Sequence, residues 1–156
     1  LSIIKPKMAT DSSIYIFTSW KVYAETEKVI KEYFDVKNLI VWDKMNHGSG
    51  DIDAIWSERH ELIIYATKGN PKRIGKRLDN IIDCPRVKSL EHPTEKPIEL
   101  LSTIIDVSTI KGELVVDPFV GSGNTLDAAK KLGRKYFGSE IEEKWYEVAQ
   151  SRLSKW

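Results

Sequence analysis

The segment Asp-Pro-Phe-Val-Gly-Ser-Gly-Asn-Thr at residues 117–125 constrains the fold of this chain more than any other. Residues 113–116 before it are typical of a buried strand, and Leu126, Ala129 and Leu132 after it recur at helical spacing. Two glycines at such a strand-to-helix turn let the backbone bend sharply, and they let a ligand approach without a Cβ in the way. The amides that follow begin a helix, so they offer unpaired N–H donors and a partial positive charge to an anionic group.

An acidic residue follows the next strand along the chain. Glu140 lies nineteen residues after Gly121, at the end of a second apolar strand at 136–138. An acid in this position can accept hydrogen bonds from ribose hydroxyls. Glu140 is therefore a candidate ribose ligand.

Three general explanations of the glycines compete with a specific one. A dinucleotide-binding fingerprint requires a third glycine, where this chain has Leu126. A phosphate-binding P-loop requires Gly-Lys-Ser or Gly-Lys-Thr, which the sequence lacks. A glycine turn of any α/β domain remains open, because the glycines alone do not distinguish it from a ligand site.

Composition and length restrict the class of protein. At 156 residues with 41% hydrophobic residues, the chain is long and apolar enough for one domain with a real core. A formal net charge of +1 argues neither for nor against nucleic acid. The single cysteine, Cys84, excludes an internal disulfide, so we expect a reducing cytoplasm. No apolar run reaches the length of a membrane span, and the first residue, Leu1, suggests that the chain begins inside a longer reading frame.

The pattern predicts strands that alternate with helices. We expect strands at 13–18, 38–42, 61–67, 113–116 and 136–138. We expect helices at 20–34 with Ser19 as its cap, from Ile98, from Asn124 to a left-handed Gly133, and from Glu142 to about Leu153 with Trp145, Val148 and Ala149 buried. This alternation predicts an α/β sheet, mostly parallel, with helices on both faces.

In such a sheet, ligands bind outside the carboxyl ends of the strands, near a switch in strand order. Asp117, Glu140 and Trp20 each follow a predicted strand. We therefore expect these three residues to converge at one edge.

Basic residues concentrate between 68 and 88, where seven residues are Lys or Arg and two are Asp. One interpretation is a solvated loop that keeps the protein in solution. The other is a set of phosphate contacts, since basic side chains beside a substrate cleft hold a nucleic-acid backbone. The candidate DNA-binding residues are Lys72, Arg73, Lys76 and Arg77.

The complete 117–125 segment resembles the cofactor motif of the S-adenosylmethionine-dependent DNA amino-methyltransferases, in the permuted (beta) group that carries this motif near its carboxyl end. His-Pro-Thr-Glu-Lys-Pro at 92–97 is similar to the segment before the cofactor strand of that family. Residues 40–44, and residues 59–61 with the strand and the Lys-Gly pair at 68–69 that follow them, resemble family segments on the side of the target base. The alternative for 92–97 is a proline-bounded helix start with Thr94 as its cap.

The resemblance implies S-adenosylmethionine as cofactor and a Rossmann-like α/β methyltransferase sheet, circularly permuted and incomplete at its amino-terminal side. It implies one methyltransferase domain at 1–156, with a target-base half at 1–70, a basic connecting segment at 71–91 and a cofactor half at 92–156. It assigns cofactor contacts to the following residues: His92, Thr94, Lys96, Asp117, Pro118, Phe119, Gly121, Gly123, Asn124, Thr125 and Glu140. No residue is assigned to a metal.

Other residues have weaker assignments. An enzyme that methylates a base must unstack it and hold it between flat or apolar groups. Trp20 is the candidate for this stacking, and core packing is the alternative for a single aromatic residue. His60 is given no proton-transfer role, and Cys84 is taken as a bystander.

The sequence departs from the family at the catalytic motif. In the family, the exocyclic amine attacks the sulfonium methyl in line, and Asp-Pro-Pro-Tyr or a close variant positions that amine. This chain has no Pro-Pro, so no catalytic residue is assigned in it. By resemblance, the missing strand lies between the strands at 113–117 and 13–18, and its absence leaves two central strands with unpaired edges.

The sequence therefore predicts a fragment or subunit of a DNA methyltransferase that modifies the exocyclic amine of adenine, or of cytosine. Adenine is preferred on its frequency in the family alone. The expected partners are double-stranded DNA and either a second copy or an upstream fragment that completes the sheet, with no membrane. The alternatives are a non-catalytic cofactor-binding remnant or partner module, and a methyltransferase that acts on RNA or a small molecule.

Overall fold

A computed structural model of the chain describes residues 1–46, 56–72, 74–87 and 94–154. The elements are, in chain order, η1 (Lys5–Lys7), β1 (Ser12–Thr18), α1 (Tyr23–Lys31), β2 (Asp35–Asp43), β3 (His60–Lys68), β4 (Ile81–Asp83), α2 (Ile98–Ser108), β5 (Leu114–Asp117), α3 (Asn124–Lys131), β6 (Lys135–Gly138) and α4 (Glu143–Ser154). They form two compact units: unit 1 comprises 1–73 and 77–85, and unit 2 comprises 74–76 and 86–156. None of the helices in the described ranges is long and apolar enough to cross a membrane.

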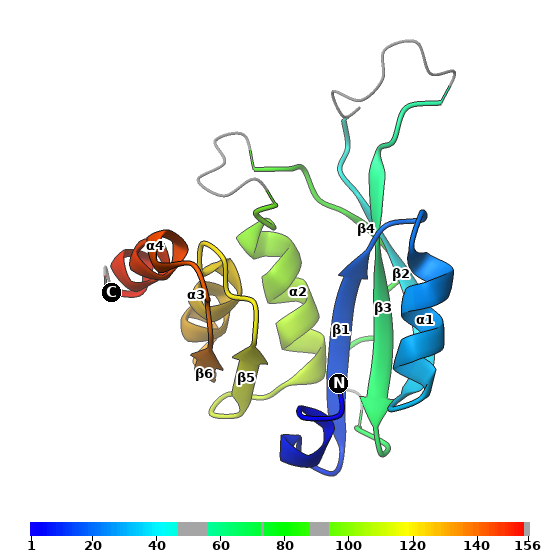
Figure 1. The fold of residues 1–156 in the computed structure, drawn as a ribbon, viewed down its shortest axis with the longest axis horizontal. Helices are drawn as coiled ribbons and strands as arrows, with labels where there is room; N and C mark the ends of the chain where they lie inside the picture. Colours follow the sequence, from blue (N-terminus) through cyan, green and yellow to red (C-terminus); the bar gives the residue numbers. More distant parts are fainter. Residues whose placement is uncertain (47–55, 73, 88–93, 155–156) are drawn as a thin grey trace. The chain divides into compact units, whose positions relative to one another are not determined.

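Unit 1 contains a four-stranded sheet with the order β1-β3-β2-β4 (Figure 1). β3 is antiparallel to both of its neighbours, while β2 and β4 are parallel. The expectation of a mostly parallel sheet is therefore wrong for this unit. β1 and β2 run in the same direction with α1 between them in sequence, but β3 returns from β2 and inserts between the two.

The core of unit 1 lies on β3. Ile63 and Ile64, which point to opposite faces of the sheet, are both 0% exposed. On one face Ile30 and Phe34 pack with Ile64, so α1 covers that side. Trp42 of β2 is also buried, and its indole N–H donates to the Cys84 carbonyl at 2.7 Å.

Three details of unit 1 differ from the sequence analysis. α1 begins at Tyr23 rather than near Trp20, and its N-cap is Val22, which makes no side-chain cap bond. The predicted Ser19 cap is wrong, because the Ser19 carbonyl instead accepts the Val22 N–H in a turn before the helix. β4 is a short strand inside the segment that was expected only to connect the two halves.

Unit 2 contains a parallel pair of strands, β5 and β6, joined through α3. α3 ends as predicted, with Gly133 in a left-handed conformation at φ +71°. The Gly133 N–H donates to the Lys130 carbonyl, and the Arg134 N–H donates to the Ala129 carbonyl. These two bonds form a Schellman cap, which satisfies carbonyls at the end of the helix.

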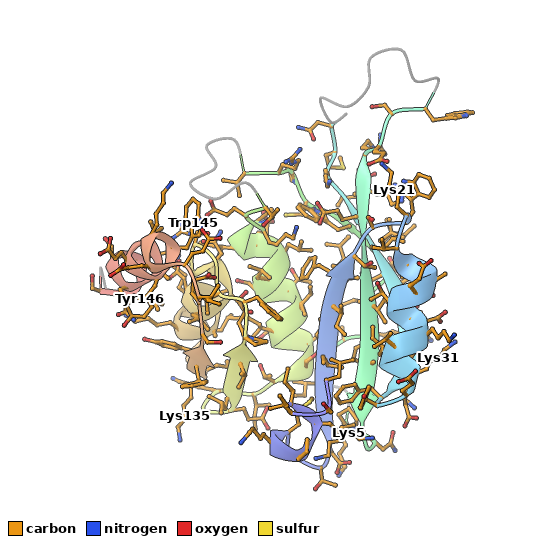
Figure 2. All side chains as sticks on the ribbon, viewed as in Figure 1. Lys5, Lys21, Lys31, Lys135, Trp145 and Tyr146 are labelled. Atoms are coloured by element: carbon orange, nitrogen blue, oxygen red, sulfur yellow. The ribbon has the colours of Figure 1, made fainter. Side chains whose placement is uncertain are left out.

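Burial in unit 2 is lower than expected. The apolar residues of β5 were predicted to be buried, but Leu114 and Val116 are 57% and 53% exposed. α4 buries Ala149, whereas Trp145 is only half-buried and Tyr146 is exposed (Figure 2). The prediction of a buried strand at 113–116 is therefore wrong for Leu114 and Val116 of β5.

Candidate functional site

The turn between β5 and α3 adopts the left-handed backbone that its glycines permit. Gly121 has φ +53° and Gly123 has φ +90°, a region that disfavours residues with a Cβ. Asp117 fixes the start of the turn, because its Oδ1 accepts the Phe119 N–H at 2.9 Å. The Pro118 carbonyl accepts the Ser139 hydroxyl at 2.9 Å, which ties the turn to the end of β6.

Two glycines at the site serve close packing within the protein. A Cβ on Gly123 would lie 3.0 Å from the Cα and the Cβ of Ala149 in α4. A Cβ on Gly138 would lie 2.3 Å from Val120 Cγ2 and 2.6 Å from the Asp117 carbonyl oxygen. At Gly123 the missing Cβ therefore makes room for α4, and not for a ligand as expected from the sequence.

Glu140 holds the turn from the opposite side. Its Oε2 accepts the Gly121 N–H at 2.7 Å, and its Oε1 accepts the N–H groups of Ile141 at 2.9 Å and Glu142 at 3.0 Å. The carboxylate thus connects the glycine turn to the residues that precede α4. This structural role was not apparent from the sequence.

A buried polar network lies at the start of α3. Asn124 and Asp127 are 5% and 2% exposed, and the Oδ1 atom of each has no hydrogen-bond partner among the described residues. Asn124 Nδ2 donates to Glu95 Oε1 and to the Lys96 carbonyl, each at 2.8 Å. Glu95 also accepts from Arg152 Nη1 at 2.8 Å, and the sequence did not predict a role for either residue. Neither has a local pattern that predicts this pairing, since 57 positions separate them.

The remaining predicted cofactor residues lie around this turn. Phe119 is 84% exposed, and Thr125 is half-buried in the first turn of α3. Lys96 contacts the site through its carbonyl, and Thr94 is exposed. Thr94 is not the cap of α2, because the N-cap residue is Pro97 and it makes no side-chain cap bond. His92 lies outside the described residues.

Trp20 belongs to unit 1, where it follows β1. The residue is 59% exposed, so core packing does not explain it, and its indole N–H donates to Glu58 Oε1 at 2.9 Å. This bond, with the nearby Lys21 ammonium, lowers the pKa of the Glu58 carboxyl. Lys21 Nζ lies 3.4 Å from Glu58 Oε1 and 5.8 Å from the centroid of the Trp20 ring.

The basic segment presents charged side chains to solvent. Lys72, Lys76 and Arg77 are exposed, and Arg73 lies outside the described residues. The ion pairs found among the described residues involve none of these three. Their charges are thus open to an external anion such as a phosphate.

Comparison with known proteins agrees with this arrangement. Residues 76–151 match the family model described as DNA methylase. The chain belongs to the DNA methylase family. Its fold is accordingly the Rossmann-like α/β fold of the S-adenosylmethionine-dependent methyltransferases.

Three relatives show the extent of the similarity. The chain is 29% identical to the Type II methyltransferase M2.DpnII of Streptococcus pneumoniae over 172 residues, which cover 98% of this chain and 64% of the relative. It is 30% identical to the DNA adenine methyltransferase YhdJ of Escherichia coli strain K12 over 176 residues, which cover 90% of this chain and 60% of the relative. The crystal structure of an M1.HpyAVI–SAM complex is 29% identical, with a TM-score of 0.83 over 95% of this chain and 77% of that one. The chain thus spans less than two thirds of the length of these two curated relatives.

Proposed function

We propose that this chain is the cofactor-binding part of a DNA amino-methyltransferase that uses S-adenosylmethionine. The observation that carries the proposal is the left-handed glycine turn of unit 2, which Glu140 holds through the Gly121 N–H. The M1.HpyAVI structure, which resembles this chain, is a complex with SAM. The complete protein would transfer a methyl group to an exocyclic amine in DNA.

The residues present are compatible with this cofactor. The N–H groups that open α3 suit an anionic carboxylate, and the Glu140 carboxylate at the end of β6 suits ribose hydroxyls. The buried Asn124 Oδ1 offers an acceptor for which the described residues supply no donor. S-adenosylmethionine supplies the electrophilic methyl group, while the chain binds and orients it.

Calorimetry with S-adenosylmethionine tests the assignment. Because Glu140 would contact the ribose and also holds Gly121, Glu140→Ala should weaken binding by about 1–3 kcal/mol. Glu142→Ala is the matched control, because Glu142 is also a glutamate, lies two residues after Glu140 and has an exposed side chain. Equal affinity of the wild type and Glu140→Ala, or no binding by the wild type, would contradict the proposal.

We propose adenine as the target base and Trp20 as the residue that stacks on it. The E. coli relative is a DNA adenine methyltransferase, and the exposed Trp20 ring is available for stacking. In the complete protein, Trp20→Ala should reduce methylation strongly, whereas Trp20→Phe should retain most of it. Equal loss in both variants would show that stacking is not the role of Trp20.

The DNA backbone is proposed to contact the basic segment. If Lys72, Arg73, Lys76 and Arg77 neutralise phosphates, the logarithm of the duplex affinity should fall linearly with the logarithm of salt concentration. Reversing all four charges should flatten this slope. A control reverses four exposed lysines elsewhere: Lys7, Lys28, Lys37 and Lys135. If both sets change the slope equally, the basic segment is a solvated loop and not a DNA contact.

We further propose that the 156 residues alone transfer no methyl group. The sequence lacks Asp-Pro-Pro-Tyr, and in-line transfer requires the amine to be held within about 3–3.5 Å of the methyl carbon. In the described sheets β1 and β5 each pair on one side only, and such edges recruit a second copy or an additional segment that carries the missing strand.

Tritiated methyl transfer to mixed-sequence duplex, with and without an added upstream segment, tests this proposal. Robust transfer by the isolated, monodisperse chain would contradict it, while inactivity in both cases would favour a non-catalytic cofactor-binding module.

A further inference from the structure

The side chain of Glu95 connects three segments of unit 2. Its Oε1 accepts hydrogen bonds from Asn124 Nδ2 and from Arg152 Nη1, both at 2.8 Å. Glu95 precedes α2, Asn124 begins α3, and Arg152 lies in the last turn of α4. The side chains of Glu95 and Arg152 are only 4% and 19% exposed, so this ion pair is largely removed from water. Buried charge-assisted hydrogen bonds of this kind hold their partners in one geometry.

These contacts determine which way the Asn124 amide faces. The amide nitrogen has two hydrogens, and it donates them to Glu95 Oε1 and to the Lys96 carbonyl. A flipped amide would place an oxygen against these two acceptors, so both bonds would be lost and replaced by repulsion. The Asn124 Oδ1 atom is therefore directed away from Glu95, into a buried position where the described residues offer it no donor.

A buried acceptor requires a donor from a ligand or from water. Asn124 is the first residue of the helix that follows the glycine turn, so it lies next to the proposed cofactor site. We propose that Glu95 is a positioning residue, which orients Asn124 so that Oδ1 accepts an N–H of the α-ammonium group of S-adenosylmethionine. This inference rests on the proposed function, and it identifies the part of the cofactor that the site recognises through Asn124.

Arg152 completes the arrangement. Its guanidinium keeps the Glu95 carboxylate in place from the far side, through the same Oε1 atom that accepts from Asn124. Glu95→Gln removes the charge, so Oε1 can accept the same two hydrogen bonds only without charge assistance, and the new side-chain NH2 group adds a donor where the carboxylate had an acceptor. The Asn124 amide then keeps the bond to the Lys96 carbonyl but loses the charge-assisted one, so the orientation of Oδ1 is held less strongly.

The test compares two ligands by calorimetry: S-adenosylhomocysteine, and its analogue without the α-amino group. The wild-type chain should prefer the first by about tenfold to a hundredfold, the scale of a hydrogen bond to a charged group. In Asn124→Ala and Glu95→Gln this preference should fall to within about twofold of equality. Glu99→Gln, an exposed glutamate in the first turn of α2, is the matched control and should keep the wild-type preference. If the role of Glu95 is purely structural, Glu95→Gln would weaken the binding of both ligands by the same factor, and the ratio of their affinities would stay at the wild-type value.

The outcomes separate the inference from the proposed function. A wild-type ratio near one, or a folded Glu95→Gln chain with the wild-type ratio, would overturn the positioning role while leaving cofactor binding intact. If Glu95→Gln does not fold, Arg152→Lys serves instead, because it loses the planar guanidinium but keeps the charge, and a wild-type ratio there would also overturn the role. Failure of the wild type to bind either ligand would contradict the proposed function and this inference together.

Discussion

The sheets of the two units differ in how much of their apolar surface they bury. In unit 1, β3 lies between β1 and β2, and Ile63 and Ile64 on its two faces are 0% exposed. In unit 2, Leu114 and Val116 of β5 lie beside Lys135 and Phe137 of β6, and Phe137 is 65% exposed. The central strand of the first sheet is part of a core, while Leu114, Val116 and Phe137 of the second sheet stay exposed.

The glycine turn at 117–125 thus forms at the end of a sheet that is only partly buried. The turn is held by local contacts: the Asp117 carboxylate at its start, the Glu140 carboxylate across from it, and the close approach of α4 at Gly123. A site built in this way can persist in a unit whose sheet is only partly covered. We expect substitutions in unit 1 to act on stability and substitutions at the turn to act on binding.

The largest expected effect is on the core of unit 1. Ile63→Ala should lower the free energy of unfolding by about 2–5 kcal/mol, because it leaves a cavity beside a fully buried strand. Val116→Ala, on the exposed face of β5, should change it by less than about 0.5 kcal/mol. Urea unfolding followed by circular dichroism measures both. Similar losses in the two variants would show that the exposed face of β5 is covered after all.

The next largest effect is on stability and cofactor affinity together, and a control glycine distinguishes it from the cost of backbone strain alone. Gly138→Ala places a Cβ against Val120 and the Asp117 carbonyl, so it should cost about 1–3 kcal/mol of stability and also weaken S-adenosylmethionine binding. Gly112→Ala is the control, because Gly112 has φ +89° with nothing within 4 Å of the added Cβ. It should cost about 1 kcal/mol through strain alone and leave the affinity unchanged. Loss of affinity in both variants would indicate a general effect of instability on the site.

The smallest effect is a pH dependence confined to unit 1. The Arg59 guanidinium and the Met45 N–H lower the pKa of Asp43 below its ordinary value of 3.8. Since the folded pKa is the lower one, the stabilisation is present above the unfolded pKa and is lost as the pH falls through the folded pKa, below about pH 4. Asp43→Asn and Arg59→Gln should each lose slightly less stability than the wild type between about pH 6 and about pH 3. An identical acid dependence in all three proteins would show that this ion pair makes no contribution.

The sequence predicted the positions of most elements because their signals are local. The β-branched runs at 13–18 and 61–67 correspond to β1 and β3, and the glycine turn lies between β5 and α3 as expected. The family and the fold class followed from the same turn, since its nine residues are specific.

Strand order, burial and the Glu95 network could not be predicted, because they depend on residues far apart in the chain. β3 pairs antiparallel with both β1 and β2, and the sequence of β3 alone does not indicate which strands it will pair with or in which direction. The same apolar pattern gives a buried strand in β3 and a half-exposed one in β5, since exposure depends on what covers each face. The hydrogen bonds of Glu95 to Asn124 and Arg152 require α2, α3 and α4 to be packed together.

The proposed cofactor site lies in unit 2, at the turn between β5 and α3. Amide ¹H–¹⁵N spectra of the labelled chain, recorded while S-adenosylhomocysteine is added, test this residue by residue. We predict shifts at 117–125 and at Glu140 and Ile141, with the amides of β1 and β3 unchanged. Saturating ligand that shifts only β1 and β3, or shifts no amide at all, would contradict the claim.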